Sequence, residues 1–343
     1  MKVLILGGGG NIGFWVEKLL IENNDYVYSI QRGTQKIKRT HSKNPKNFFI
    51  IRDDINELSE TSKELVNNCD VIIDFVCFSA ANARERIRLL SDFPGLLIMI
   101  STVAVYDRSL GTNILSSVSS CKNVKWAYAK NKLEAEEALL DGLKPGRVVI
   151  CRLGHTFDIV LPVPFGVGDW TFVKWLLDGN PLMLFRGMDS RWSLFHSRDV
   201  ARRILLVAAN AENFTSVLNI ANPQSVSWLE IGKAIYSTLD IPEKFRYISV
   251  DALRNLYPYW SESVIFHKQF DEVYVGDEIK KFSQLGEDDW DLAAGLRISL
   301  NFYLRNKPFQ TVNQFYYDKF LLLAANSQIG AQLKRQMQNG EFD

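Results

Sequence analysis

The sequence predicts an α/β protein with a doubly wound parallel sheet and a smaller, interleaved domain toward the C-terminus. Short apolar runs alternate with stretches of helical periodicity from residue 2 to residue 151, the pattern of parallel strands joined by helices. A glycine-rich run separates the first apolar run from the first helical stretch. The 343 residues, 47% hydrophobic and 23% charged, are enough for a large core and about two domains.

Six apolar runs are expected to form strands of this sheet. The first, residues 2–6, has four apolar residues in succession, as expected for a strand that is buried on both faces. The other runs lie at residues 26–30, 48–52, 71–76, 96–100 and 147–151. Helical periodicity separates most of them, at residues 12–22, 58–68 and 81–90 and in a stretch that contains Tyr128 and runs to about residue 140, so the strands should run parallel.

The composition of the chain changes after Arg152, and prolines and aromatic residues cluster in residues 162–170. A later helical stretch and a strand-like run, residues 198–209 and 217–220, look like a return to the sheet. We therefore expect an interleaved second domain and not a separate C-terminal block. The predicted division is a first domain of residues 1–155 to which 191–225 return, a smaller domain of 156–190 and 226–310, and a helical extension of 311–343, packed through Phe315, Phe320 and Leu323.

Composition and charge exclude several classes of protein. The net charge of +1 provides no overall field toward nucleic acid or a membrane. No apolar run is long enough to span a bilayer, and no signal sequence is recognised, so a soluble cytoplasmic protein is expected. No Cys/His cluster has the spacing of a zinc site, so no metal is expected, and the scattered cysteines should be buried thiols: Cys69, Cys77, Cys121 and Cys151.

The glycine run after the first strand predicts a dinucleotide-binding loop. Gly7, Gly10 and Gly13 have the spacing Gly-x-x-Gly-x-x-Gly, with Asn11 and Ile12 between the last two. Glycine is needed there for a tight turn, for close approach of the backbone to a pyrophosphate, and for helix–strand packing. The N-terminus of the following helix would offer N–H groups to the phosphates.

The end of the second strand indicates which dinucleotide is bound. An acidic residue there usually holds a free ribose 2′-hydroxyl, and an arginine accommodates a 2′-phosphate. The sequence has Arg32 after Gln31 and no acid, which favours NADP, with NAD as the alternative. The nearby Lys36 and Lys38 are expected to be solvated loop charges.

Two further segments complete the predicted cofactor site. Asp54 and Ile55 follow the third strand, and the Asp54 carboxylate could bind the adenine amino group. The same carboxylate would suit a helix N-cap almost as well. Val76, at the end of the fourth strand, is also assigned to the cofactor.

Tyr128 and Lys132 form the most informative pair in the chain. They are one helical turn apart, so both side chains can project from the same face of a helix. A phenol with a pKa of about 10 becomes a better acid or base beside an ammonium group. Such pairs are common on solvated helix faces, and this one gains significance from the glycine loop in the same chain.

With these features in hand, the chain resembles the extended branch of the short-chain dehydrogenase/reductase superfamily, the NAD(P)-dependent nucleotide-sugar epimerases, dehydratases and reductases. The resemblance covers about residues 1–305. Besides the glycine loop and the Tyr-x-x-x-Lys pair, it rests on segments in the family's order, at residues 100–106, 152–155, 193–201 and 219–223.

The resemblance implies a Rossmann domain with a substrate domain, and it implies roles for single residues. Tyr128 would exchange a proton with a substrate hydroxyl or carbonyl, and Thr102 would hydrogen-bond the same oxygen. Lys132 would bind the nicotinamide ribose and lower the pKa of the tyrosine. His155 would lie near the mouth of the site as a substrate contact, whereas His196 and Asp199 are interpreted as structural.

The chain also departs from the family. Val103 and Ala104 stand where family dehydratases have an acidic pair, so elimination chemistry is not expected. Trp192 stands where many members have a diphosphate-binding arginine, and Arg191, one residue earlier, is assigned to the substrate instead.

The predicted function is hydride transfer at a secondary alcohol or ketone of a nucleotide-sugar-like substrate, by an epimerase or a reductase. The alternatives are a non-sugar carbonyl reductase and a non-catalytic RNA-binding relative of the fold. The near-neutral charge and the complete set of Thr102, Tyr128 and Lys132 argue against RNA binding. A homodimer is expected by analogy only.

Overall fold

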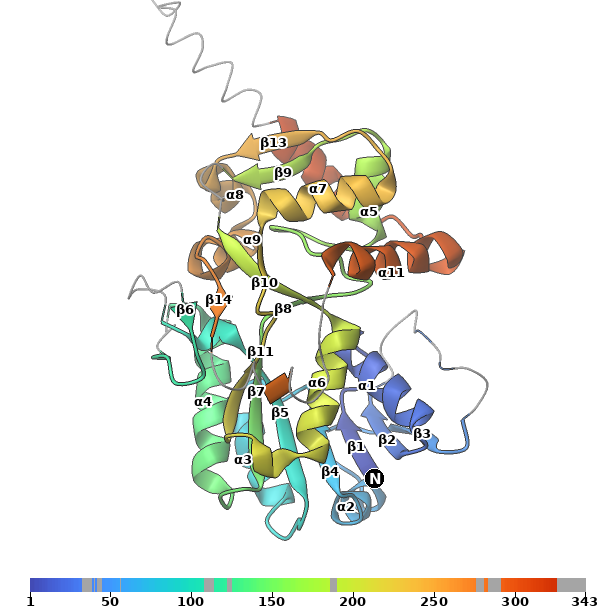
Figure 1. Ribbon diagram of the computed structural model, residues 1–343, viewed down its shortest axis with the longest axis vertical. Coiled ribbons are helices and arrows are strands. Elements are labelled where there is room, and N and C mark those ends of the chain that lie inside the picture. Colours follow the sequence, from blue (N-terminus) through green and yellow to red (C-terminus); the bar gives the residue numbers. More distant parts are fainter. Residues whose placement is uncertain are drawn as a thin grey trace, which may run out of the picture. The chain divides into compact units, whose positions relative to one another are not determined.

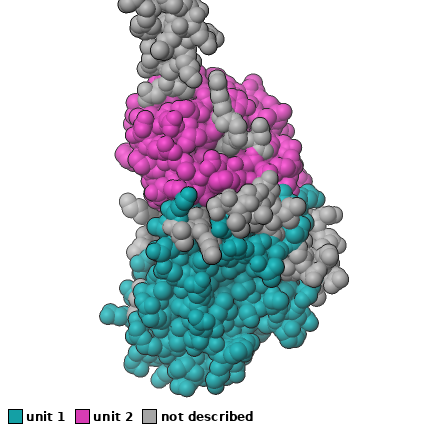
Figure 2. Space-filling view, turned by 90° about the vertical axis from the view of Figure 1, so that its left-hand side faces the viewer, with its two compact units in different colours: residues 1–157, 193–224, 273–290 teal, residues 158–192, 225–272, 291–343 magenta. Residues whose placement is uncertain are grey.

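The computed structural model of the chain describes residues 1–32, 39, 41, 45–55, 57–107, 114–121, 125–185, 190–275, 281–282 and 291–325. The chain divides into two compact units, which Figure 2 shows in teal and magenta. The first unit comprises residues 1–157, 193–224 and 273–290, and the second comprises residues 158–192, 225–272 and 291–343.

A parallel sheet of seven strands forms the centre of the first unit, as predicted (Figure 1). Its order is β11-β7-β5-β4-β1-β2-β3, and all neighbours are parallel. The chain builds outward from β1 to β3, then crosses back to β4, so the order reverses between β1 and β4. The strands are β1 (Lys2–Leu6), β2 (Tyr26–Gln31), β3 (Phe48–Arg52), β4 (Val71–Asp74), β5 (Leu96–Thr102), β7 (Val148–Leu153) and β11 (Val217–Ile220).

Helices cover both faces of this sheet. Val3 and Ile5 of β1 pack with residues of α1 (Asn11–Glu22) and α6 (Ser197–Ala209). Leu4 and Leu6 point to the other face, in a cluster with residues of α2 (Glu60–Asn67), α3 (Ala80–Leu89) and α4 (Ala127–Gly142). Because both faces are buried, β1 reads as a continuous apolar run and not as an alternating one.

Residues 273–290 belong to the first unit, although the sequence placed them in the substrate domain. The short strand β14 (Val273–Tyr274) pairs in parallel with β6 (Ile114–Leu115), and Phe282 joins the core of the sheet. A two-residue strand has no sequence signal of its own, so this return of the chain was missed. The first unit also contains β8 (His155–Phe157), η1 (Val103–Val105) and η3 (Ala211–Asn213), and β8 pairs with β10 (Arg191–His196).

The second unit is mostly helical. Its two-stranded parallel sheet joins β9 (Leu182–Phe185) to β13 (Phe245–Ile248). Aromatic rings form much of its core: the Phe320 ring lies 5.6 Å from Trp175 and 5.8 Å from Trp260. The other elements are α5 (Trp170–Leu177), β12 (Ser225–Ser227), α7 (Trp228–Leu239), α8 (Val250–Leu256), α9 (Pro258–Ser263), η4 (Val264–Lys268), α11 (Leu292–Arg305) and η5 (Lys307–Phe309).

The C-terminal extension is helical over residues 314–325 and is grouped with the second unit. Phe320 and Leu323 are buried, as predicted, but Phe315 is 63% exposed, so its predicted packing role is wrong. Phe315 lies in the first turn of the helix, five residues before Phe320, a spacing that places the two rings on different faces. In the described part of the chain, no helix is long and apolar enough to cross a membrane.

Candidate functional site

The glycine loop lies at the carboxyl end of β1, next to the reversal of strand order, where α/β sheets bind ligands. Gly7 adopts a φ of +83°, which favours glycine, and its N–H donates to Ile30 O at 3.0 Å. A Cβ at Gly13 would lie 2.2 Å from Gly8 O, so this glycine lets the helix approach the loop. A Cβ at Gly10 would meet no atom within 4 Å.

This loop fits the phosphates of a dinucleotide. Gly10 is the N-cap of α1 and supplies no side-chain hydrogen bond, and the first turn contains no acidic residue. The first N–H groups of the helix therefore remain available to an anion, at the positive end of the helix dipole. Gly10, Asn11, Ile12 and Gly13, all assigned from the sequence, lie at this helix end.

Two alanine substitutions should separate packing from ligand approach in the loop. Gly13→Ala is expected to destabilise the first unit, because its methyl group would overlap the backbone at Gly8. Gly10→Ala should leave the melting temperature almost unchanged and weaken dinucleotide binding, since its methyl group would occupy the space in front of the helix. Thermal unfolding and cofactor titration of both variants test this, and unimpaired binding by Gly10→Ala would contradict it.

The carboxyl end of β2 offers cations and no free acid. Arg32 is exposed directly after the strand and has no hydrogen-bond or ion-pair partner among the described residues. Glu17 of α1, which reaches the end of β2, is buried and accepts from Ser29 Oγ at 2.5 Å and Gln31 Nε2 at 3.2 Å. Glu17 also contacts His41 Nε2 at 2.9 Å.

Sequence reasoning missed this use of Glu17, because helix periodicity does not show that α1 passes under the end of β2. It also passed over Arg39, whose guanidinium stacks on Phe14 at 4.0 Å and donates to Asn11 O at 3.1 Å. Lys36 and Lys38 lie outside the described residues.

After β3, Asp53 and Asp54 have different surroundings. Asp53 accepts from the N–H and hydroxyl of Ser59 at 3.0 and 2.7 Å, and from Ser62 Oγ at 2.5 Å. The bonds from Ser62 and Ser59 lower the pKa of Asp53 to about 2. Ser59 is the N-cap of α2, so the capping alternative considered for Asp54 belongs to Ser59, with Asp53 holding it. Asp54 stays exposed.

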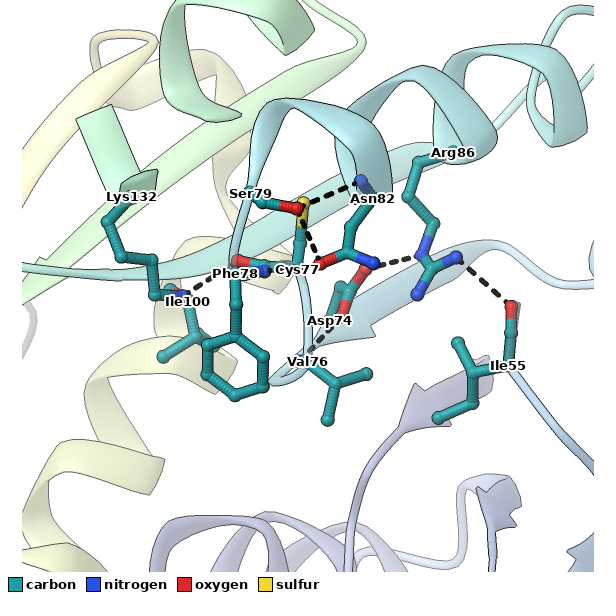
Figure 3. Close-up of polar contacts among 10 residues, drawn as sticks. All are labelled: Ile55, Asp74, Val76, Cys77, Phe78, Ser79, Asn82, Arg86, Ile100 and Lys132. Carbon is teal, nitrogen blue, oxygen red and sulfur yellow. Dashed lines mark hydrogen bonds and ion pairs between the residues drawn. The ribbon is translucent and has the colours of Figure 1, made fainter. Parts of the chain in front are cut away.

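Val76 lies against the glycine loop, since a Cβ at Gly7 would be only 2.5 Å from its Cγ1. The Val76 N–H donates to Asp74 Oδ1 at 2.7 Å. The buried Asp74 carboxylate is paired with Arg86 of α3, Nε to Oδ2, at 2.7 Å. Arg86 Nη1 in turn donates at 3.1 Å to the carbonyl of the buried Ile55. Figure 3 shows this chain of contacts.

The structure brings Thr102 and Tyr128 together. Thr102 is the last residue of β5, and its hydroxyl also accepts from Ala104 N–H at 3.2 Å. Tyr128 is in the first turn of α4, 40% exposed, and its phenol lies close enough to the Thr102 side chain for that hydroxyl to lower the pKa of the phenol. A hydroxyl pair that remains partly open to solvent is suited to bind one oxygen atom of a ligand.

Lys132 is buried one turn further along α4 (Figure 3). Its ammonium donates to Cys77 O at 2.9 Å and to Ile100 O at 2.8 Å. It also lies 4.7 Å from the centre of the half-exposed Phe78 ring. Burial lowers the pKa of Lys132, and the nearby Asp74 opposes this shift.

The lowered pKa predicted for Tyr128 is not what the structure shows. Burial raises the pKa of the phenol. Among the described residues, the Thr102 hydroxyl is the group that lowers this pKa. The reason is geometric: the Lys132 ammonium is directed to two backbone carbonyls and not to the phenol. In this arrangement Tyr128 is a protonated phenol at neutral pH.

A buried polar network connects α4 to β5 and β7. Glu136, one turn after Lys132, accepts from Ser101 Oγ and from Arg152, at 3.0 Å from Nε and 2.6 Å from Nη2. The network continues to Tyr106, whose hydroxyl donates to Asn219 Oδ1 at 2.6 Å. Burial would lower the pKa of Arg152, but the bond to Glu136 and its charge raise it above its usual value. The sequence alone did not reveal this network.

The histidines and Arg191 have other roles or neighbours. His196 is fully buried and is the N-cap of α6, where Nδ1 accepts from Arg198 N–H at 3.1 Å. Asp199, in the first turn of α6, is paired with Arg198 at 3.1 Å, which supports the structural interpretation of both residues. His155 is half-buried in β8.

In the second unit, Arg191 is bound to Ser225, with Nε to Oγ at 3.1 Å. It also faces Glu230 at 3.7 Å. The large rings that could have stacked on a substrate are buried instead, as core packing: Trp170, Trp175, Trp192 and Trp260. Among the described residues, no cluster of His, Cys, Asp or Glu is arranged to hold a metal ion.

The chain matches a family profile, a curated relative and several solved structures. The sequence profile described as "NAD dependent epimerase/dehydratase family" matches residues 3–221. A 2'-dehydrokanamycin reductase of Streptomyces kanamyceticus is 22% identical over 256 residues, 74% of this chain and 70% of that protein.

Solved structures share the fold at low identity. A dTDP-glucose 4,6-dehydratase from Bacillus anthracis, in complex with NAD, superposes with a TM-score of 0.69 at 16% identity, over 90% of this chain and 98% of that one. A UDP-glucuronic acid 4-epimerase from Bacillus cereus, in complex with UDP-glucuronic acid and NAD, gives 0.65 at 17% identity, over 89% and 99%.

Proposed function

The chain belongs to the NAD dependent epimerase/dehydratase family, and on that premise we propose that it transfers a hydride between a nicotinamide cofactor and a secondary alcohol or ketone carbon. The observation that carries this proposal is that the Thr102 and Tyr128 side chains lie together at the carboxyl end of β5. Lys132 lies one turn along the same helix. The glycine loop follows β1, two strands away in the sheet.

We assign the roles of the side chains from the family resemblance, and this geometry supports them. Tyr128 gives a proton to the substrate carbonyl oxygen or takes one from the hydroxyl, and Thr102 hydrogen-bonds the same oxygen. Lys132 offers its ammonium to the ribose next to the nicotinamide and holds the carbonyls of Cys77 and Ile100. When bound, the nicotinamide supplies or accepts the hydride.

We infer reduction of a ketone as the direction of the reaction. The Tyr128 phenol, whose pKa burial raises further, is protonated at neutral pH like a free phenol, so it can donate a proton to a carbonyl oxygen. A reductase is also what the curated relative is named. The family name keeps an epimerase as the second candidate, in which the hydride returns to the same carbon from the other face. Val103 and Ala104, both buried, provide no acid–base pair for dehydration.

We infer NADP as the preferred cofactor and a sugar-like ketone as the substrate class. Arg32 is exposed directly after β2, and the Glu17 carboxylate beside that strand is engaged by Ser29, Gln31 and His41. The nucleotide sugar of the solved epimerase and the dehydrokanamycin of the curated relative support a glycosidic substrate. Nucleotide extracted from the purified protein tests the reaction type: retained NAD favours an epimerase, and an empty site that takes NADPH favours a reductase.

Arg32→Ala is expected to weaken NADPH binding and leave NADH binding nearly unchanged. Loss of a charge-assisted contact to phosphate should reduce the NADPH preference by about tenfold or more. Fluorescence titration of both dinucleotides measures this ratio. Arg84→Ala, which removes an exposed arginine from α3, serves as the control. An unchanged ratio in the Arg32 variant would show that the 2′-phosphate is bound elsewhere or not at all.

A further inference from the structure

The buried ion pair of Asp74 and Arg86 has no part in the proposed proton and hydride transfer. Asp74 is fully buried at the end of β4, and Arg86 is 1% exposed in α3. Burying two charges costs several kcal/mol in desolvation, and a buried pair is often no more stabilising than apolar residues of the same size. Stability alone is therefore a weak explanation for this pair, and its neighbours suggest another.

The pair connects segments that border the candidate cofactor site. Asp74 Oδ1 accepts from Val76 N–H at 2.7 Å, and the Val76 side chain lies against Gly7 of the glycine loop. Arg86 Nη1 donates to Ile55 O at 3.1 Å and so holds the segment after β3. Asp74 and Arg86 thus hold the segments after β3 and β4 (Figure 3). The segment after β4 lies against the glycine loop through Val76.

The same carboxylate also influences Lys132, which binds the segment after β4. The hydrogen-bond acceptors of the Lys132 ammonium, Cys77 O and Ile100 O, are neutral carbonyls. The groups whose charge favours its protonated form are Asp74 from β4, then the Cys77 thiol, then Glu136 from α4. Glu136 is paired with Arg152, as Asp74 is with Arg86, and Cys77 is a protonated thiol, because burial raises its pKa to about 12.

We propose that Asp74 and Arg86 are positioning residues of the cofactor site. They hold the segments after β3 and β4 in register with the glycine loop, and Asp74 adds a counter-charge beside the Lys132 ammonium, which is bound to Cys77 O in the segment that Asp74 holds. The inference rests on the proposed function for its role in cofactor binding. Its electrostatic part concerns only residues of this chain and can be measured without any dinucleotide.

Asp74→Asn is the first test, because it keeps the shape of the side chain and removes its charge. The titration midpoint of Lys132 is followed by NMR on protein labelled with ¹³C at the lysine ε-carbon, with the signal assigned from Lys132→Arg. The midpoint is expected to fall by about one pH unit or more. NADP⁺ binding, measured by calorimetry at one pH, should weaken roughly tenfold.

The double variant Asp74→Asn/Arg86→Gln separates this role from stability. It leaves no buried charge uncompensated, so its melting temperature should exceed that of Arg86→Gln alone. The Lys132 midpoint should stay lowered, because the counter-charge is still missing. If Asp74→Asn does not fold, the Lys132 midpoint of the double variant provides the test of the inference.

Asp25→Asn is the matched control. Asp25 is also buried and paired with an ammonium, that of Met1 at 2.5 Å, at the opposite end of the sheet. It should lose stability and leave the Lys132 midpoint and NADP⁺ affinity unchanged. A Lys132 midpoint equal to wild type in both Asp74 variants would overturn the inference. A wild-type protein that binds neither NAD⁺ nor NADP⁺ would instead refute the proposed function.

Discussion

Tyr128→Phe is expected to reduce turnover by about 10²- to 10⁴-fold, the range for loss of a general acid. The substitution removes one hydroxyl, the group that Thr102 contacts and that the substrate oxygen would meet. Cofactor affinity should stay within about twofold, since the phenol forms no bond to the glycine loop or to Lys132 in the described structure. Single-turnover kinetics with NADPH, together with dinucleotide titration, separate the two effects.

Thr102 provides a graded companion to this experiment. Thr102→Ser keeps the hydroxyl and should retain much of the activity, whereas Thr102→Ala should lose a large part of it. Tyr26→Phe is the control for removal of a phenol hydroxyl, because Tyr26 is 51% exposed at the start of β2. Full turnover by Tyr128→Phe on an identified substrate would end the assignment of Tyr128 as the proton donor.

Arg152→Met is expected to cause the largest loss of stability, about 3–5 kcal/mol. The change leaves the buried Glu136 carboxylate of α4 without its cation, and among the described residues only the Ser101 hydroxyl remains as a donor. Chemical denaturation of the variant and the wild type measures the loss.

The same helix contains a control for this experiment. Lys130 and Glu134 form an exposed i,i+4 pair on α4, and Glu134→Gln should change stability by no more than about 0.5 kcal/mol. The double variant Arg152→Met/Glu136→Gln should regain stability relative to Arg152→Met. A single variant as stable as wild type would mean that the pair is not the main support of α4.

The fold was predictable because its signals are local. Apolar runs such as residues 2–6 and the glycines after them occur in unbroken segments, and each can be recognised without knowledge of the rest. The pairing of β14 with β6 was not predictable, because two residues provide no periodic pattern. The position of residues 273–290 followed from that pairing and was missed with it.

The site was predictable only as far as one helix and one strand end could show it. Tyr128 and Lys132 are four residues apart, and their shared helix was expected. The direction of the Lys132 ammonium is set by the carbonyls of Cys77, which follows β4, and of Ile100 in β5. Because the ammonium is directed to these carbonyls, it does not lower the pKa of Tyr128. The groups around Glu136 and Asp74 likewise meet only in the folded chain.

Gly8 and Glu17 limit how this protein can change. A Cβ at Gly8 would lie 2.0 Å from Glu17 Oε1 and 2.6 Å from Ser29 Oγ, so any side chain there would displace a buried carboxylate from its donors. Loss of the carboxylate, in turn, would leave Ser29 and Gln31 without the group that they share. The two positions are therefore expected to vary together: a relative with a side chain at position 8 should lack the acid at position 17 and should also leave free the space that Ser29 Oγ fills here.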